Sequence, residues 1–354
     1  MTLSADYCYI CTMYRQIIRP LLFKLSPENA HNLTLRMLGA VRKVPLCSRL
    51  MKRFFSYDNP SLRRTVFGMD FPNPVGLAAG IDKNGEYYNE LSWFGFSFLE
   101  IGSLTPLPQD GNPKPRLFRL PQDRALINRM GINNKGIFNA IEHIKKDRPK
   151  VILCASIAKN STSAADEDII SDYKRAYSYM YDFVDMFTVN VSCPNVEGLQ
   201  HLQDVSYLSD IIDPLLDLRV GYDTYKPLLV KVSPDIPREE LDEILDYCLL
   251  SGIDGIVAGN TTTSREGLST PKKRVEAIGK GGLSGAPLFE RSLALVEYIH
   301  KRTGGRLPIV GVGGIMGAAQ AQKMLDAGAS LIEICTGFIY EGPSAVKRIL
   351  KKIK

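Results

Sequence analysis

The 354-residue sequence lacks the features that define several large classes of protein. No stretch approaches the ~18 consecutive apolar residues of a membrane-spanning helix. The polar, Arg-containing start does not resemble a signal peptide. The seven cysteines are scattered and odd in number, which argues against a disulfide framework. We therefore expect an intracellular protein that does not span a membrane.

Metal-ligand patterns are also missing. Cys8 and Cys11 form a C-x-x-C pair, but no second Cys or His pair lies at metal spacing. No strand pattern precedes the pair, as a redox motif would require. The other cysteines do not form an iron–sulfur cluster pattern either. We interpret the pair as incidental and expect no metal site.

Excess positive charge is confined to the N-terminal segment. The net charge of the chain is +6. Residues 1–66 hold 11 Lys/Arg and 3 Asp/Glu, whereas residues 67–354 hold 33 Lys/Arg and 35 Asp/Glu. Such asymmetry suggests an acidic partner, either nucleic acid or an anionic membrane. No aromatic platform or known nucleic-acid module accompanies the charge, so we do not predict a nucleic-acid role.

Two helical patterns occupy this basic segment. Apolar residues recur at helical spacing from Tyr14 to Leu22 and from Ala30 to Val41, and Ser26 followed by Pro27 is a start signal. The residues leave two readings open: a docked helical pair with a solvated basic face, or an amphipathic hairpin on an anionic membrane surface. A polar stretch at 56–64 predicts a linker, so we divide the chain into an extension, 1–66, and a main domain, 67–354.

Short apolar runs alternate with helical stretches from residue 70 onward. The candidate strands are 75–79, 97–102, 151–157, 186–191, 228–232, 254–258, 308–312 and 331–335. Helical patterns fill most gaps, for instance 205–217, 238–250, 288–302 and 317–327. Eight βα units over ~280 residues predict an α/β fold, the closed (β/α)8 TIM barrel. The Pro- and Asn-rich segment 103–135, which contains RLFRL, predicts an inserted hairpin on the catalytic face.

Polar residues at the predicted strand ends indicate the chemistry, because the C-terminal strand ends of such a barrel build its site. These residues are mainly amides, lysines and glycines: Lys83, Ser103, Ser156, Asn190, Cys193, Asn195, Lys231, Asn260, Thr261, Gly313, Gly314, Cys335 and Thr336. The inserted loop adds Asn128, Arg129 and Asn133. Paired carboxylates, a histidine and a metal cluster are missing from this set. It suits a planar, amide-like, anionic ligand, because Asn offers both a donor and an acceptor.

Three glycine-rich segments predict a phosphate site near the last strands. They are GVGGIMG at 311–317, ICTGF at 334–338 and GGLSGAP at 281–287. Backbone N–H groups and a helix N-terminus bind anions at this place in many barrels. Tight turns alone are the alternative explanation of these glycines.

Taken together, these motifs resemble the dihydroorotate dehydrogenase family, in its membrane-associated, quinone-using class 2 form. LLFKLSPENAHNLTLRML resembles that class's N-terminal helical extension. Further segments resemble the signature segments of the family and occur in the same order: NPVGLAAGIDKNGE, FLEIGSLTPLPQDGNPKPRLFRL, INRMGINNKG, NVSCPNVEGL, LLVKVSPD, GNTT, GGLSGAPL and PIVGVGGI. The resemblance covers nearly the whole chain. It implies an FMN-containing barrel that oxidises (S)-dihydroorotate to orotate with a membrane quinone as acceptor, in de novo pyrimidine biosynthesis.

The resemblance also implies roles for individual residues. FMN contacts are implied for Ala79, Gly80, Lys83, Ser103, Asn190, Lys231, Gly285, Gly314 and the backbone of Cys335 and Thr336. Substrate contacts are implied for Lys83, Asn128, Arg129, Met130, Gly131, Ile132, Asn190, Asn195, Asn260 and Thr261. Lys231 can stabilise negative charge on reduced flavin, and Lys83 can pair with the substrate carboxylate or ring oxygens. Cys193 stands at the position of the catalytic base.

Some positions depart from the class 2 pattern. The base there is ordinarily serine, whereas Cys193 is the residue type of the soluble class 1 enzymes. Val196 and Ile132 replace a Thr and an aromatic residue thought to help carry the proton away. A free thiol has a pKa near ~8.5, far below that of a hydroxyl, so it can act as base without such a relay. We expect the three changes to be coupled. Ser156 and Gly259 replace an Asn and a Thr that contact FMN, so contact by their side chains is in doubt.

Two alternative functions stay open at this point. One is a class 1-type enzyme that uses fumarate or NAD, which Cys193 favours and the N-terminal extension opposes. The other is a non-catalytic phosphate- or nucleotide-binding barrel at a membrane surface. Because no transit peptide precedes the helices, we expect a peripheral membrane protein on the cytoplasmic face of a bacterial inner membrane.

Overall fold

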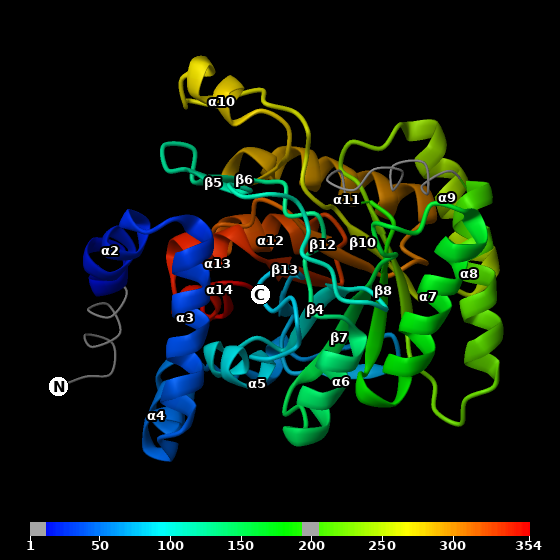
Figure 1. The fold of residues 1–354 in the computed structure, drawn as a ribbon, viewed down its shortest axis with the longest axis horizontal. Coiled ribbons are helices and arrows are strands. Elements are labelled where there is room, and N and C mark those ends of the chain that lie inside the picture. Colours follow the sequence, from blue (N-terminus) through cyan, green and yellow to red (C-terminus); the bar gives the residue numbers. More distant parts are fainter. Residues whose placement is uncertain (1–11, 193–204) are drawn as a thin grey trace.

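Eight parallel strands form a closed barrel in the computed structural model, which describes residues 12–192 and 205–354 (Figure 1). They are β3 (Val75–Leu77), β4 (Phe98–Leu104), β7 (Ile152–Ile157), β8 (Met186–Asn190), β9 (Leu228–Val232), β10 (Gly255–Ala258), β12 (Ile309–Val312) and β13 (Leu331–Ile334). Each strand pairs with the next along the chain, and β13 pairs with β3. Each one overlaps a strand predicted from the sequence, so the predicted barrel is confirmed.

Helices cover the outside of the barrel because the strands are apolar on both faces. The covering elements are α5 (Tyr88–Leu91), η3 (Ser92–Phe94), α6 (Ile137–Lys146), α7 (Asp166–Met180), η4 (Tyr181–Phe183), α8 (Val205–Val220), α9 (Arg238–Ser251), α11 (Phe289–Thr303), α12 (Ala318–Asp326), α13 (Thr336–Glu341) and α14 (Ala345–Leu350). Gly252 and Gly304 end α9 and α11 in the left-handed conformation.

An antiparallel hairpin closes the N-terminal end of the barrel. It consists of β1 (Arg64–Val66) and β2 (Met69–Phe71). Phe71 meets Phe98 of β4 edge to face, with ring centroids 5.5 Å apart. The hairpin pairs residues on both sides of the predicted domain boundary at residue 66, and the division into two parts stays a prediction.

The predicted insertion is a hairpin of β5 (Leu117–Leu120) and β6 (Ala125–Asn128). The glycine-rich segment GGLSGAP forms a third strand, β11 (Gly282–Gly285), which pairs with β6. The short η6 (Ala286–Leu288) follows it, and α10 (Lys272–Ile278) precedes it beyond the hairpin (Figure 1). The sequence predicted the hairpin but not the third strand, because β6 and β11 are far apart in the chain.

Helices from the N-terminal segment run along one side of the barrel (Figure 1). They are η1 (Tyr14–Ile18), α2 (Arg19–Lys24), α3 (Pro27–Arg42) and α4 (Pro45–Phe55), and the short η2 (Pro60–Leu62) follows them. Ser26 caps α3 by accepting a hydrogen bond from the Asn29 N–H at 3.4 Å, as its start signal predicted. The sequence had not indicated α4. Among the described residues, none of these helices has the length and hydropathy to cross a bilayer.

Candidate active site

One large cavity, of about 600 Å³, lies at the C-terminal ends of the barrel strands. The strand ends and the inserted hairpin line it mainly with polar groups and glycines, including Lys83, Ser103, Asn128, Asn190, Lys231, Asn260, Thr261, Ser284, Gly285, Gly314 and Thr336. The N-terminal helices and α13 line it mainly with apolar groups, including Ile18, Leu22, Leu35, Met37, Leu38, Val41, Phe338 and Ile339. The cavity is within the size range of small-molecule sites and is continuous from its polar to its apolar part.

The structure brings most of the sequence-predicted site residues to this cavity. Every described residue expected at FMN lines it: Ala79, Gly80, Lys83, Ser103, Asn190, Lys231, Gly285, Gly314, Cys335 and Thr336. So do Asn128, Met130, Gly131, Ile132, Asn260 and Thr261 from the set expected at the substrate. Cys193, Asn195 and Val196 lie outside the described residues, as do Cys8 and Cys11.

Arg129 is the exception, because it does not line the cavity. Its guanidinium donates to the carbonyl oxygens of Ile278 and Lys280, at 2.5 and 3.1 Å, and lies over the Phe118 ring. Successive residues of an extended chain point to opposite faces. Asn128 at the end of β6 faces the cavity, and the next side chain therefore points away and holds the segment between α10 and β11.

A chain of hydrogen bonds orients the amides of the polar part. The Asn190 Nδ2 group donates to Ser103 Oγ at 2.8 Å, and Ser103 Oγ is 2.7 Å from Ser156 Oγ. Asn260 donates to Ser192 Oγ at 2.9 Å. Ser156 is fully buried behind Ser103 and does not line the cavity, so its side chain supports the site from behind.

Lys83 lies on a loop that a buried carboxylate shapes. Asp82 Oδ1 and Oδ2 accept the backbone N–H groups of Glu86 and Tyr87 at 2.9 and 2.7 Å, and burial raises the pKa of Asp82 to about 6. Lys83 Nζ donates to the Gly80 carbonyl at 2.7 Å. Burial lowers the pKa of Lys83 from its ordinary value. A lysine with so few polar partners is suited to bind an anionic ligand.

Lys231 projects from β9 into the barrel, where it forms an ion pair with Glu100 of β4, with Nζ and Oε2 3.0 Å apart. Burial alone would lower the pKa of Lys231, but the carboxyl groups of Glu100 and Glu333 outweigh burial and raise it. Sequence reasoning missed both glutamates. The available signal was one acidic residue inside each of the apolar strands FLEIGSL and LIEI, because buried charges need partners.

Glycines form the wall where the phosphate site was predicted. A Cβ at Gly314 would lie 2.4 Å from the Phe289 backbone, and one at Gly285 would lie 2.4 Å from the Arg124 carbonyl oxygen. Both have positive φ, which other residues adopt only with strain. The structure therefore requires glycine there, and the wall presents backbone to the cavity.

His31 and Arg119 are polar groups in the part of the cavity near the N-terminal helices. Burial lowers the pKa of His31 to about 3, so its imidazole is neutral at physiological pH. Arg119 donates to the Leu25 carbonyl at 2.7 Å and lies over the Phe23 ring. Its neighbour on the hairpin, Arg116, binds both carboxylate oxygens of Glu28, at 2.7 and 3.3 Å. These contacts attach the N-terminal helices to the inserted hairpin.

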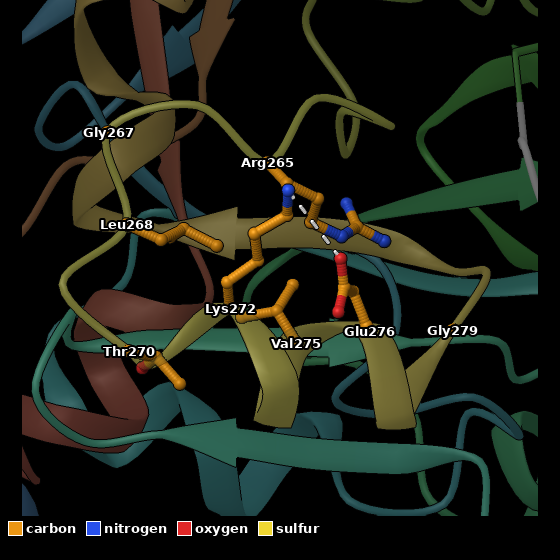
Figure 2. Close-up of a pocket in the computed structure, with 8 residues that line it drawn as sticks. All are labelled: Arg265, Gly267, Leu268, Thr270, Lys272, Val275, Glu276 and Gly279. Atoms are coloured by element: carbon orange, nitrogen blue, oxygen red, sulfur yellow. Dashed lines mark ion pairs between the residues drawn. The ribbon is translucent and has the colours of Figure 1, made fainter.

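A second hollow lies outside this site, between the loop 265–270 and α10 (Figure 2). Its volume is about 440 Å³. The ion pair at its edge joins Lys272 and Glu276, whose side chains are 90% and 63% exposed, and such pairs contribute little to stability or binding. The sequence-predicted site residues line the barrel cavity, and we assign the chemistry there.

Comparison with known proteins agrees with the fold and the cavity. The model of the family described as dihydroorotate dehydrogenase matches residues 61–354. The dihydroorotate dehydrogenase (quinone) of Coxiella burnetii is 45% identical over 343 residues, covering 96% of each chain. That of Christiangramia forsetii is 43% identical over 341 residues, covering 96% of this chain and 98% of its own.

Solved structures give the same result. The ligand-free enzyme of Eimeria tenella matches with a TM-score of 0.82 and 33% identity, covering 92% of this chain and 94% of its own. The structure of its complex with ferulenol matches with a TM-score of 0.80 and 35% identity, covering 92% of this chain and 90% of its own. The chain therefore belongs to the dihydroorotate dehydrogenase family.

Proposed function

We propose that this chain oxidises dihydroorotate to orotate with FMN as cofactor and passes the electrons to a quinone, in pyrimidine biosynthesis. The observation that carries the proposal is the single cavity with a polar part at the strand ends and an apolar part against the N-terminal helices. A polar, anionic substrate suits the first part and an apolar acceptor suits the second. The names of the bacterial relatives, which are quinone-dependent, support this choice of acceptor.

The residues at the strand ends fit FMN. Gly285 and Gly314 bring backbone to the cavity wall, and backbone N–H groups suit a phosphate. Gly80 has open space where a Cβ would stand. We assign FMN binding to these glycines with Ala79, Lys83, Ser103, Asn190, Lys231, Cys335 and Thr336. Bound FMN would accept a hydride from the substrate and yield the electrons to the quinone. Lys231 supplies a fixed positive charge for the reduced form.

The substrate would lie among the remaining polar groups of the cavity. Lys83 binds its carboxylate or ring oxygens, and the amides of Asn128, Asn190 and Asn260 bind ring N–H and C=O groups. Met130, Gly131, Ile132 and Thr261 complete this part of the wall, and we assign Asn195 to it from the sequence. Cys193 removes the C5 proton as the thiolate. We do not assign the Arg129 side chain to the substrate, because it points away from the cavity.

Bleaching of bound flavin by dihydroorotate tests cofactor, substrate and base together. In a stopped-flow experiment across pH, the wild-type protein should bleach rapidly. Cys193→Ala should bind FMN but lose reduction by dihydroorotate, because the C5 proton has no acceptor. Cys193→Ser should also be impaired, because Val196 and Ile132 offer a hydroxyl no proton path.

Cys47→Ala is the matched control, since Cys47 is exposed on α4 and does not line the cavity. It should bleach like wild type. Rapid bleaching of Cys193→Ala would contradict the assignment of the base. A colourless protein without affinity for added FMN would instead favour a phosphate-binding barrel, and reduction of fumarate or NAD without reduction of a quinone analogue would favour the class 1 alternative.

We further infer that the N-terminal helices contact an anionic membrane surface, at the cytoplasmic face of a bacterial inner membrane. Exposed large apolar side chains gather on them: Met13, Ile17, Ile18, Leu21, Leu25, Leu33, Met37, Val44, Leu46, Leu50 and Phe54. Exposed basic residues lie among these: Lys24, Arg36, Lys43, Arg49, Lys52 and Arg53. Apolar and basic groups on the same helices are typical of a peripheral membrane contact.

Vesicle co-sedimentation tests this contact. The protein should bind vesicles that contain anionic lipid, and binding should weaken at high salt. The double variant Leu46→Ser, Leu50→Ser should bind about thirtyfold more weakly, because each of the two buried apolar side chains contributes on the order of 1 kcal/mol. Leu250→Ser, which changes an 88% exposed leucine on α9 at the opposite side of the barrel (Figure 1), is the control. Equal binding by both variants would contradict the assigned surface.

A further inference from the structure

Three charged residues form a buried layer inside the barrel. Glu100 of β4, Lys231 of β9 and Glu333 of β13 are each at most 6% exposed. They stand two residues after Phe98, Leu229 and Leu331, which belong to the apolar cluster inside the barrel. Because side chains alternate along a strand, the charged layer lies on that cluster, and Lys231 and Glu333 also line the cavity.

Two of the four oxygens of these carboxyl groups are buried without a hydrogen-bond partner among the described residues. Glu100 Oε2 accepts from Lys231 Nζ at 3.0 Å and from the Ala79 N–H at 2.9 Å. Glu100 Oε1 and Glu333 Oε2 are buried and have no partner within the described part of the chain if both groups are ionised. The two carboxyl groups nevertheless lie within hydrogen-bonding reach of each other. Two carboxylates can only accept, so one shared proton would satisfy both oxygens.

The charge balance of the three residues also favours one proton shared by the two carboxyl groups. Two carboxylates and one ammonium would leave a net charge of −1 buried in the barrel, which costs several kcal/mol. Glu100 Oε2 already accepts two hydrogen bonds, one of them from the Lys231 ammonium. Glu333 Oε2 has no hydrogen-bond partner among the described residues. Burial and the neighbouring Glu100 charge raise the pKa of Glu333 well above its ordinary value.

Other titratable groups around Glu333 do not supply a competing charge. Cys154 of β7 is bonded to Thr188 at 3.3 Å, and burial raises the pKa of its thiol well above the ordinary value. Burial also raises the pKa of Cys335, to about 11, so both thiols are neutral. Lys83 and Arg119 also line the cavity, but the neighbouring charges that act most on Glu333 are Glu100 and Lys231. The flanking strands β3 and β12 carry no titratable side chain.

We propose that Glu333 is a positioning residue that stays protonated in the folded protein and donates a hydrogen bond to Glu100. This bond holds Glu100 against Lys231 and the Ala79 backbone, and it keeps the buried layer electrically neutral. Lys231 then faces bound FMN without a second negative charge beside it. The inference rests on the proposed function through the assignment of Lys231 to FMN.

Glu333→Gln is the decisive variant, because glutamine is a neutral donor of the same shape. The midpoint potential of bound FMN gives the ratio of its affinities in the reduced and oxidised states. If Glu333 is protonated, this ratio should stay within about threefold of wild type. An ionised Glu333 would instead make the variant favour reduced FMN by about tenfold or more, because a negative charge would have been removed. That result would overturn the proposal.

Two further measurements separate positioning from general stability. The infrared difference spectrum of wild type minus Glu333→Gln, recorded near pH 8, should contain the carbonyl band of a protonated carboxyl group, which is otherwise absent at this pH. Its absence would overturn the proposal without reference to FMN. Glu333→Leu removes the hydrogen-bond donor to Glu100 and should weaken FMN binding by about tenfold. Glu333→Gln keeps a donor and should keep the wild-type affinity for FMN.

Glu276→Gln is the control for loss of a carboxylate elsewhere, because Glu276 is exposed on α10. It should match wild type in FMN affinity and potential. A Glu333→Leu protein that binds FMN like wild type would contradict the positioning role. If wild type itself bound no FMN, the proposed function would fail, and the infrared band would still decide the protonation of Glu333.

Discussion

Several charged and polar side chains lie inside the barrel or line its cavity. Glu100, Glu333 and Lys231 lie in the barrel, and His31 lies against the apolar part of the cavity. For His31, Lys231 and Glu333, burial acts most strongly on the pKa and neighbouring charges act next. Protonation of such residues is therefore coupled to folding, and pH measurements can detect them one at a time.

His31 provides a test at this scale. Its pKa is about 3 in the folded protein and about 6.5 when unfolded, so the unfolded chain binds the proton first as pH falls. The His31 contribution is fully present above pH 6.5 and is lost progressively as pH falls toward 3. Relative to His31→Gln, the wild type should lose about 2 kcal/mol of unfolding free energy between pH 7 and pH 5. Urea unfolding at the two pH values measures this difference.

His300→Gln serves as the comparison, because His300 is exposed on α11. It controls for the loss of an imidazole from the protein surface. If His31→Gln shifted stability equally at both pH values, His31 would not be held neutral by burial.

At the scale of secondary-structure elements, one buried carboxylate joins three parts of the chain. Glu341, the last residue of α13, is 5% exposed. Arg15 of η1, Arg124 of the turn between β5 and β6, and Arg348 of α14 all pair with it. The N-terminal helices, the inserted hairpin and the end of the barrel thus share one ion-pair network.

Glu341→Gln should lower the unfolding free energy by about 2 kcal/mol. The carboxylate is buried, and its loss leaves three guanidinium groups without their shared acceptor; partial exposure of those groups limits the cost. Urea unfolding measures the effect. Glu276→Gln, which breaks the exposed pair with Lys272, should cost about 0.5 kcal/mol or less. Similar costs for the two variants would show that the network contributes no more than a surface pair.

Elements with a regular pattern could be predicted from the sequence, and contacts between distant segments could not. The eight strands were visible as short apolar runs, and Ser26–Pro27 marked the start of α3. The pairing of β11 with β6 and the contact of Glu100 with Glu333 join segments far apart in the chain. The family resemblance of INRMGINNKG placed Arg129 at the substrate. Alternation beyond the end of β6 turns its side chain outward.

At the scale of the whole molecule, the N-terminal helices and the barrel share one hydrophobic core. Leu35 and Leu38 of α3 and Phe55 of α4 are buried in the same cluster as the barrel helices and strands. Phe55 contacts Phe94 of η3, with ring centroids 5.5 Å apart. These contacts pack the extension against the barrel.

We expect extension and barrel to unfold in one transition. Trp93, the only tryptophan in the chain, lies in η3 beside Phe94 and reports on the contact with α4. Its fluorescence and the far-ultraviolet circular dichroism of the whole chain should give the same urea midpoint in the FMN-free protein. A fluorescence midpoint at clearly lower urea would show that α4 detaches before the barrel unfolds.

The cavity that runs from the strand ends to α2 and α3 has a consequence for kinetics. On the proposed membrane contact, its apolar part is reached from the lipid, and the acceptor is dissolved in that lipid rather than in water. The relevant concentration of quinone is then its mole fraction in the bilayer. Adding more vesicles at constant total quinone would dilute the acceptor in two dimensions and slow turnover, although its amount per millilitre stays the same.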